Sequence, residues 1–233
     1  MVDQEIKKFG SGCSVEHRYV SYDFCYLYFQ RNKGFLGNVN MENSCMYLWS
    51  YLASWGMLRG SSVLLQRSPA CLKELVAYFD SICHSVVWDV DVDSYASHKS
   101  EILQVYNDIS QIMERIMNHN ESNIPPKITK PSPTLITKIM LGVFGCVPAL
   151  DQYFCKTFRV LYGGFYELGS KELDRIGSFY EQEQHKELID SIRIPVLDFD
   201  GKKTELYYKK AKLIDMYGFV HGQELSKNNS TNL

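Results

Sequence analysis

The chain has 233 residues, with 25 basic and 27 acidic side chains, a formal net charge of −2 at pH 7, and 13% aromatic residues. This composition excludes disordered, collagen-like and coiled-coil chains, and the near-neutral charge excludes a uniformly basic nucleic-acid coat, although not a local basic face. No run approaches the ~18 apolar residues needed to span a bilayer, and the stretch from Met1 to Ser14 has no apolar signal core. We therefore expect a cytoplasmic protein that does not enter the membrane.

The seven cysteines are an odd number, are spread widely and include no C-x-x-C pair. A chain of this size needs no disulfides, and the ligand spacings of zinc and iron–sulfur sites are absent. The six histidines show no H-E-x-x-H arrangement. We expect free, core-packed thiols in a reducing compartment, with no cofactor, no metal and no metal cluster.

Hydrophobic residues recur at spacings of three and four along most of the chain, a pattern typical of helices with one buried face. The pattern predicts helices over residues 43–58, 68–82, 102–118, 170–188 and 204–221. Strand-like alternation is limited to residues 194–198 and to residues 19–28, and the second stretch could equally be a buried helix. The predicted fold class is mainly α, with little or no sheet.

Four prolines between residues 125 and 133 interrupt the helical pattern, because proline removes a backbone donor and restricts the residue before it. The segment is either a linker or a shaped loop between two helices. We expect one helical domain over residues 1–233, divisible into lobes over 1–125 and 126–225, with a frayed tail from Ser226.

Two clusters of charged residues admit simple interpretations. Asp89, Asp91 and Asp93 suggest a calcium loop, but the glycine and glutamate that an EF-hand requires are absent, which favours a solvated turn. The lysines between residues 202 and 212 could extend a basic surface, but their spacing favours a solvated helix face.

The segment from Lys127 to Gly163 is the most informative for function. It begins with a basic, proline-shaped turn, after which Thr134 could cap an apolar helix that stops at Gly145. A second helix follows, with Asp151 in its first turn. Free backbone N–H groups and the helix dipole favour the ionised carboxylate there, by ~0.3–1 kcal/mol at exposed sites.

The stretch TKIMLGVFGCVPALDQYFCKTFR, residues 137–159, resembles the helix–hairpin–helix (HhH-GPD) DNA glycosylases. In that superfamily a hairpin leads into an apolar helix, then into a short loop with glycine and proline, and then into a helix that opens with the catalytic aspartate. Gly145, Pro148 and Asp151 fall on the loop and the aspartate. The resemblance implies an all-helical, bundle-like glycosylase fold with a central cleft for a flipped nucleotide, with double-stranded DNA, plain or modified, as partner.

Three departures from the family pattern qualify this resemblance. The glycine-rich hairpin is replaced by the turn 130–133, and the position nearest to the lysine of lyase-competent members is Ser132, with Lys130 slightly displaced. Gln152 and Tyr153 replace the histidine or threonine that often follows the aspartate. The four-cysteine cluster of some members is missing. The resemblance therefore implies a monofunctional enzyme that uses water.

The resemblance also implies roles for individual residues. Asp151 would be the catalytic carboxylate. Base-pocket candidates, of which the first three lie between two predicted helices, are Trp55, Arg59, Gln66 and Tyr153. Phosphate-binding candidates at the turn and the helix after it are Lys127, Lys130, Ser132, Thr134 and Lys138. Trp55 as ordinary core and Arg59 as an ordinary surface charge stay open.

The leading hypothesis is a monofunctional DNA glycosylase that hydrolyses the N-glycosidic bond of a flipped, damaged or modified base and leaves an abasic site. The departures from the family suggest an unusual lesion or modified base, such as one in foreign DNA during antiviral defence. The alternatives are a non-catalytic α-helical module that binds nucleic acid or protein, and a helical regulatory protein unrelated to nucleic acid. The sequence does not indicate an oligomeric state.

Overall fold

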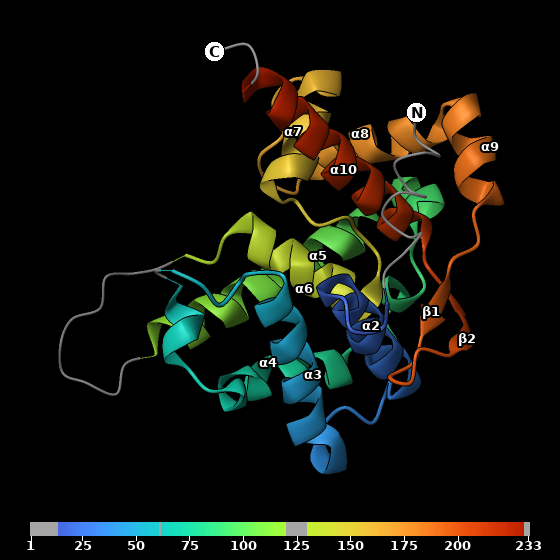
Figure 1. Ribbon diagram of the computed structural model, residues 1–233. Coiled ribbons are helices and arrows are strands. Elements are labelled where there is room, and N and C mark those ends of the chain that lie inside the picture. The colour runs from blue at the N-terminus through green and yellow to red at the C-terminus, as the bar shows by residue number, and fades with distance from the viewer. Residues whose placement is uncertain (1–13, 61, 120–129, 231–233) are drawn as a thin grey trace.

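In a computed structural model the chain is mainly helical (Figure 1). The structure describes residues 14–60, 62–119 and 130–230, with side chains as far as residue 227. Its α-helices are α2 (Ser21–Arg31), α3 (Met41–Ser54), α4 (Lys73–Ser81), α5 (Tyr95–Asn118), α6 (Pro133–Phe144), α7 (Gln152–Tyr162), α8 (Ser170–Glu181), α9 (Glu183–Ser191) and α10 (Lys210–Ser230). Short 3-10 helices span Arg18–Val20, Asn38–Asn40, Val63–Gln66, Pro69–Leu72, Val86–Trp88 and Val92–Ser94. The prediction of a mainly α fold is confirmed.

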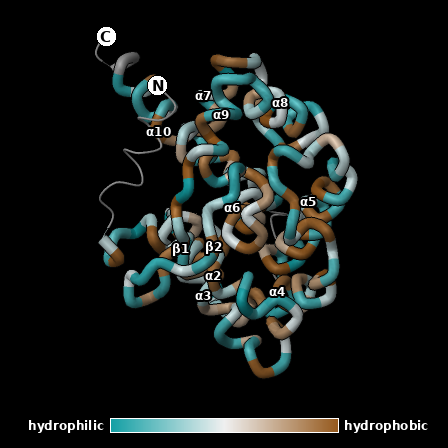
Figure 2. The backbone as a smooth tube through the Cα atoms, turned by 90° about the vertical axis from the view of Figure 1, so that its right-hand side faces the viewer, coloured by the Kyte–Doolittle hydropathy of each residue, from teal (hydrophilic) through white to brown (hydrophobic). Residues whose placement is uncertain are grey.

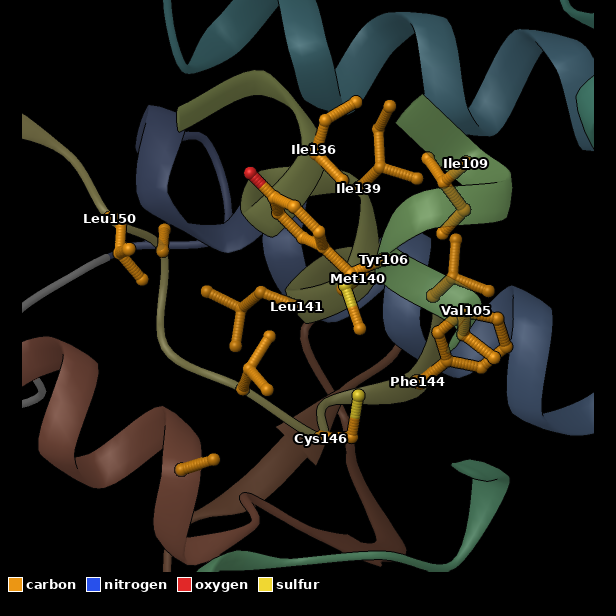
Figure 3. Packing of buried hydrophobic residues seen from close by; sticks show 14 of the residues in the cluster. Val105, Tyr106, Ile109, Ile136, Ile139, Met140, Leu141, Phe144, Cys146 and Leu150 are labelled. Carbon is orange, nitrogen blue, oxygen red and sulfur yellow. The ribbon is translucent and has the colours of Figure 1, made fainter. Parts of the chain in front are cut away.

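Helix α6 lies in the centre of the molecule, between α2, α3 and α5 (Figures 1 and 2). Every residue from Leu135 to Phe144 is buried, so this helix has no solvated face, whereas the sequence predicted only a stripe. Figure 3 shows side chains of α6, such as Ile139, packed against those of α5, such as Ile109. A helix that is apolar on all sides belongs in a core, and α6 carries its few polar side chains into that core.

The helices predicted over 43–58, 68–82, 102–118 and 170–188 are present, with ends displaced by a few residues or with a break, as at Gln182 between α8 and α9. The predicted interruption at the prolines is confirmed, because α5 ends at Asn118 and α6 begins at Pro133. Residues 120–129, with the proposed lobe boundary and Lys127, lie outside the described residues.

The C-terminal helix prediction was wrong over its first part. Residues Lys203–Tyr207 form strand β2, which pairs antiparallel with β1 (Pro195–Leu197), and α10 begins only at Lys210. The buried carboxylate of Asp23 explains part of this arrangement, since it accepts hydrogen bonds from the Leu197 N–H and the Tyr208 hydroxyl. The stretch 19–28, left open between strand and helix, is mostly helix α2, which continues to Arg31.

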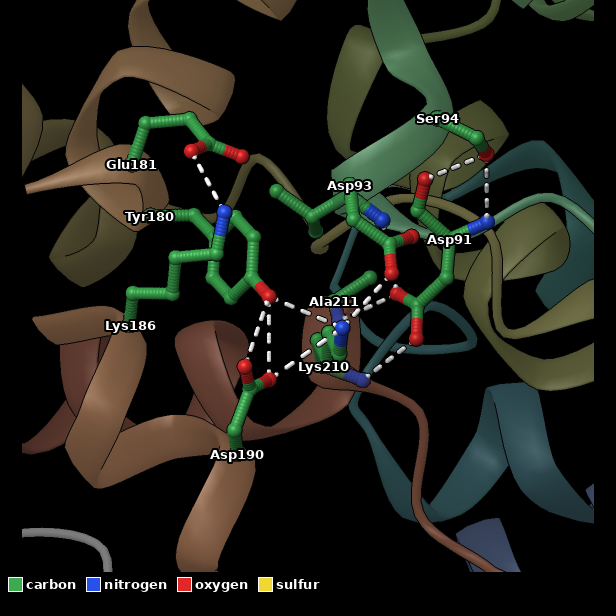
Figure 4. A network of polar contacts seen from close by, with 10 residues as sticks. Asp91, Asp93, Ser94, Tyr180, Glu181, Lys186, Asp190, Lys210 and Ala211 are labelled. Atoms are coloured by element: carbon green, nitrogen blue, oxygen red, sulfur yellow. Dashed lines mark hydrogen bonds and ion pairs between the residues drawn. The ribbon is translucent and has the colours of Figure 1, made fainter.

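The N-terminus of α10 is held by the acidic segment that the sequence assigned to a solvated turn (Figure 4). The Asp91 carboxylate accepts the backbone N–H groups of Lys210 and Ala211, at 2.8 and 2.9 Å, so it caps α10 from another part of the chain. The solvated helix face was wrong for Lys209, which donates to the carbonyls of Trp88 and Val90, and for Lys212, which is buried. Lys202 and Lys203 are exposed, but they precede α10 and do not belong to a helix. In the described part of the chain no cluster of histidine, cysteine or acidic side chains could hold a metal ion.

Helices α7 and α10 cross at very close range. A Cβ atom on Gly222 would overlap the backbone of Tyr153, and one on Gly218 would overlap the ring of Phe154. Only glycine therefore permits this distance between the two helices, and α10 comes to lie directly against the first turn of α7.

The remaining expectations concern cysteines and membranes. Six cysteines lie among the described residues; all are free thiols, and four of them are buried. Among the helices that the structure describes, none combines the length and the apolar character that crossing a bilayer requires.

Candidate active site

The loop between α6 and α7 delivers Asp151 and is itself buried. It begins at Gly145, whose positive φ of 65° ends α6. Leu150 is fixed on both sides, because its N–H donates to Thr137 Oγ1 at 2.9 Å and its carbonyl accepts from Thr134 Oγ1 at 2.7 Å. Thr134 thus holds the loop. The sequence assigned the N-cap of α6 to Thr134, but the N-cap residue is Ser132, whose hydroxyl accepts a hydrogen bond from the Leu135 N–H.

Asp151 is the N-cap residue of α7. Its Oδ1 accepts the backbone N–H groups of Tyr153 and Phe154 at 3.0 and 2.9 Å, which fixes the side chain in one orientation. The other oxygen, Oδ2, lies 3.7 Å from the ammonium of Lys138. Burial raises the pKa of Asp151, and the carboxylate of Asp215 raises it further, while Lys138 and the two N–H groups lower it.

Lys138 lies in the core beside Asp151. Its side chain is 4% exposed, and its ammonium is 4.5 Å from the centre of the Trp55 ring. Burial lowers the pKa of Lys138, and the carboxylates of Asp151 and Asp215 partly restore it. The sequence placed Lys138 among the phosphate-binding residues, but α6 is buried on all sides, so this lysine faces the carboxylate and not an outer surface.

A second buried pair, on α10, adjoins the first. Lys212 donates to Asp215 Oδ2 at 2.8 Å, and Asp215 Oδ1 accepts the backbone N–H of Ala149 at 3.0 Å. The ammonium of Lys212 also lies 5.1 Å from the centre of the Trp55 ring. Two lysines and two aspartates therefore share one buried region, which balances charges that would be costly to bury singly.

A cavity of about 620 Å³ opens above the Lys138–Asp151 pair. Eight of the residues singled out from the sequence line it: Trp55, Arg59, Lys130, Ser132, Thr134, Lys138, Asp151 and Tyr153. Arg18, Phe219 and Gln223 also line it and were not anticipated. Three lining cations, Arg18, Arg59 and Lys130, are exposed, so the cavity combines positive charge accessible to solvent with a carboxylate that is nearly shielded from it.

Among the described residues, one predicted site residue, Gln66, is not brought into the cavity. Gln66 is exposed at the end of the short helix Val63–Gln66 and does not line it. Lys127 lies outside the described residues.

Trp55 is neither plain core nor a free stacking platform. The Tyr19 ring stacks on it at 5.2 Å between centroids, and the ammonium groups of Lys138 and Lys212 lie over the same indole. Its buried Nε1 has no hydrogen-bond partner within the described chain. An unpaired buried donor is costly, so this N–H in the wall of the cavity is suited to a ligand acceptor or to water.

No protein-family model, curated protein or solved structure matches this chain.

Proposed function

We propose that this protein is a DNA glycosylase of the monofunctional kind, which hydrolyses the bond between a flipped, damaged or modified base and its deoxyribose. The observation that carries the proposal is the placement of Asp151, held by two backbone N–H groups inside a cavity that exposed cations line. The resemblance of residues 137–159 to the helix–hairpin–helix glycosylases supports the same conclusion. We further propose a cytoplasmic location, where the enzyme meets chromosomal or invading DNA.

The chemistry requires a fixed negative charge near the sugar. When the N-glycosidic bond breaks, its electron pair leaves with the base and positive charge develops on the deoxyribose. The Asp151 carboxylate would stabilise that charge, orient a water molecule toward C1′ and accept the proton that the water loses. The leaving base takes up one proton, which balances overall the proton that the water gives up, so the products are the neutral free base and an abasic site.

The cavity suits an extruded nucleotide, whose removal from the stack costs a few kcal/mol that contacts to the protein must offset. Arg18, Arg59 and Lys130 would bind the phosphates around the flipped residue, since all three are exposed and line the cavity. The Trp55 N–H and the amides of Gln152 and Gln223 would contact the base or its substituents.

The test is base release. Purified protein is incubated with duplexes and genomic DNAs that carry different lesions and natural base modifications, and released bases are identified by mass spectrometry. We expect one class of modified base to be released, with an equal yield of abasic sites. Absence of release from every substrate, together with DNA binding, would favour the non-catalytic nucleic-acid-binding module; absence of both would favour a protein unrelated to nucleic acid.

The rim cations predict a specific salt dependence. Replacing Arg59 or Lys130 by alanine should weaken DNA binding and reduce the slope of log K against log salt by about 1, because each contact releases about one counterion. Fluorescence anisotropy at several salt concentrations measures this slope. Lys171→Ala is the matched control, since Lys171 is exposed on α8 and does not line the cavity, so its slope should equal that of the wild type.

Lys138 supports a second candidate activity, in which an amine rather than water attacks the sugar. Its pKa is lowered by burial, which increases the fraction of free amine, and it lies beside Asp151. Attack of the neutral Nζ on C1′ with departure of the base, followed by ring opening, forms an imine, which borohydride reduces to a stable protein–DNA link. A monofunctional enzyme gives no such link; a link in the wild type that Lys138→Met abolishes would establish the amine-dependent reaction.

A further inference from the structure

The Lys212–Asp215 pair of α10 reaches the catalytic loop from a distant part of the sequence. Asp215 Oδ1 accepts the N–H of Ala149, which is two residues before Asp151, and Asp215 Oδ2 accepts from Lys212. We infer that Asp215 is a positioning residue of the site, which fixes the loop that carries Asp151 and sets the charge state of the Lys138–Asp151 pair. This inference rests on the proposed function.

The positional part follows from the hydrogen bonds of the loop. Thr134 and Thr137 hold Leu150 from α6, while Asp215 holds Ala149 from α10. The loop is therefore fixed between two helices immediately before the catalytic carboxylate. Misplacement of a reacting group by about 1 Å can cost about 100-fold in rate, so the loss of one of these anchors should lower turnover.

The electrostatic part follows from two neighbouring lysine–aspartate pairs, whose ammonium groups, those of Lys138 and Lys212, both lie over the Trp55 ring. The negative charge of Asp215 raises the pKa of both Asp151 and Lys138, whereas Lys212 lowers that of Lys138. Lys212 compensates the charge of Asp215, and its ammonium lies 4.6 Å from the centre of the Tyr22 ring. The Lys212–Asp215 pair of α10 therefore shifts the pKa of both Lys138 and Asp151.

The other titratable groups packed against the Lys138–Asp151 pair do not replace the negative charge of Asp215. Tyr22 and Tyr51 are fully buried, and burial raises the pKa of each, so both stay neutral. Burial raises the pKa of Cys155 to about 12 as well. Asp23 on α2 interacts with Lys212, which lowers its pKa, but burial dominates and raises that pKa to about 6. Asp215 is therefore the carboxylate whose removal should be felt most strongly at Asp151.

Two substitutions separate position from charge. Asp215→Asn keeps an oxygen that can accept the Ala149 N–H and removes the charge, whereas Asp215→Ala removes both. Base release requires ionised Asp151 and therefore fails at acid pH. Because the charge of Asp215 raises the pKa of Asp151, the acid limb of the pH–kcat profile should move to lower pH in both variants. At the plateau, kcat should fall about 10- to 100-fold in Asp215→Ala, with the KM for DNA unchanged, and should be rescued to within a few-fold in Asp215→Asn.

The control is Asp93→Asn, which also removes a carboxylate paired with a lysine of α10, at 2.6 Å from Lys210, but does not line the cavity. Its profile should match the wild type. The Asp151 titration is also followed by carboxyl carbon NMR, which does not depend on activity, and it should move to lower pH in Asp215→Asn.

The outcomes distinguish this inference from the proposed function. A wild type that releases no base, with the NMR shift present, would refute the function and leave the electrostatic link in place. A folded Asp215→Asn with an unchanged Asp151 titration would overturn the charge effect. If Asp215→Ala is folded and has wild-type kcat, the positioning role is wrong; if it does not fold, Asp215→Asn still decides the charge effect.

Discussion

Replacing Asp151 by asparagine is expected to lower the rate of base release by about 10³-fold or more while leaving the protein folded. Asparagine is as good an N-cap residue as aspartate, so the hydrogen bonds from the N–H groups of Tyr153 and Phe154 can persist. What disappears is the negative charge that stabilises the developing cation and the base that takes the proton from water. Single-turnover kinetics on the released base measures the effect without interference from product release.

Two further observations make this result specific. Affinity for uncleaved DNA should change little, because the phosphates are bound by the exposed cations of the cavity and not by Asp151. Circular dichroism and thermal unfolding should show an intact fold, although Lys138 loses its partner and some stability with it. Base release at the wild-type rate by folded Asp151→Asn would refute the catalytic role of this carboxylate.

Replacing Gly222 by alanine is expected to lower the free energy of unfolding by about 2 kcal/mol or more, and to reduce activity as well. The new Cβ would overlap the backbone of Tyr153, and backbone atoms cannot swing aside as a flexible side chain can, so α10 must move away from α7. The moved interface includes the first turn of α7, whose N–H groups hold Asp151, so the carboxylate moves too. Urea unfolding measures the first effect and kcat the second.

Gly177→Ala provides the matched control within another helix. Nothing lies within 4 Å of a Cβ at Gly177, so only the helix propensity changes, and alanine should stabilise the protein by up to about 1 kcal/mol. Replacing glycine by alanine is thus expected to lower the free energy of unfolding at Gly222 and to raise it at Gly177. Equal effects at Gly222 and Gly177 would contradict the close approach of α7 and α10.

Much of the helical layout could be predicted from local patterns. The spacing of hydrophobic residues located α3, α4, α5 and α8, because a helix with one buried face has a period that needs no knowledge of the rest of the chain. Gly145 ended its helix as predicted, since a left-handed residue at that position favours glycine. The same local reasoning failed at β2, where residues 203–207 adopt a strand through pairing with a partner strand and through the anchors on Asp23.

The candidate site was predicted in part from the sequence. Asp151, Trp55, Arg59 and Lys130 were singled out from sequence and do line one cavity. The pairing of Lys138 with Asp151 was missed, because its helix was expected to have a solvated face. One signal was present: Lys138 stands in an almost wholly apolar run, where a charged residue is buried only with a partner.

The sequence by itself determined the class of the fold, the position of the break before α6, and the aspartate at the start of α7, because periodicity, proline and helix capping act over a few neighbouring residues. Only the tertiary structure decided which charges meet. The pairs Lys138–Asp151 and Lys212–Asp215 lie far apart in the chain, since Lys212 follows Lys138 by 74 residues. Their approach depends on the burial of α6 and on the glycines of α10, which no local pattern encodes.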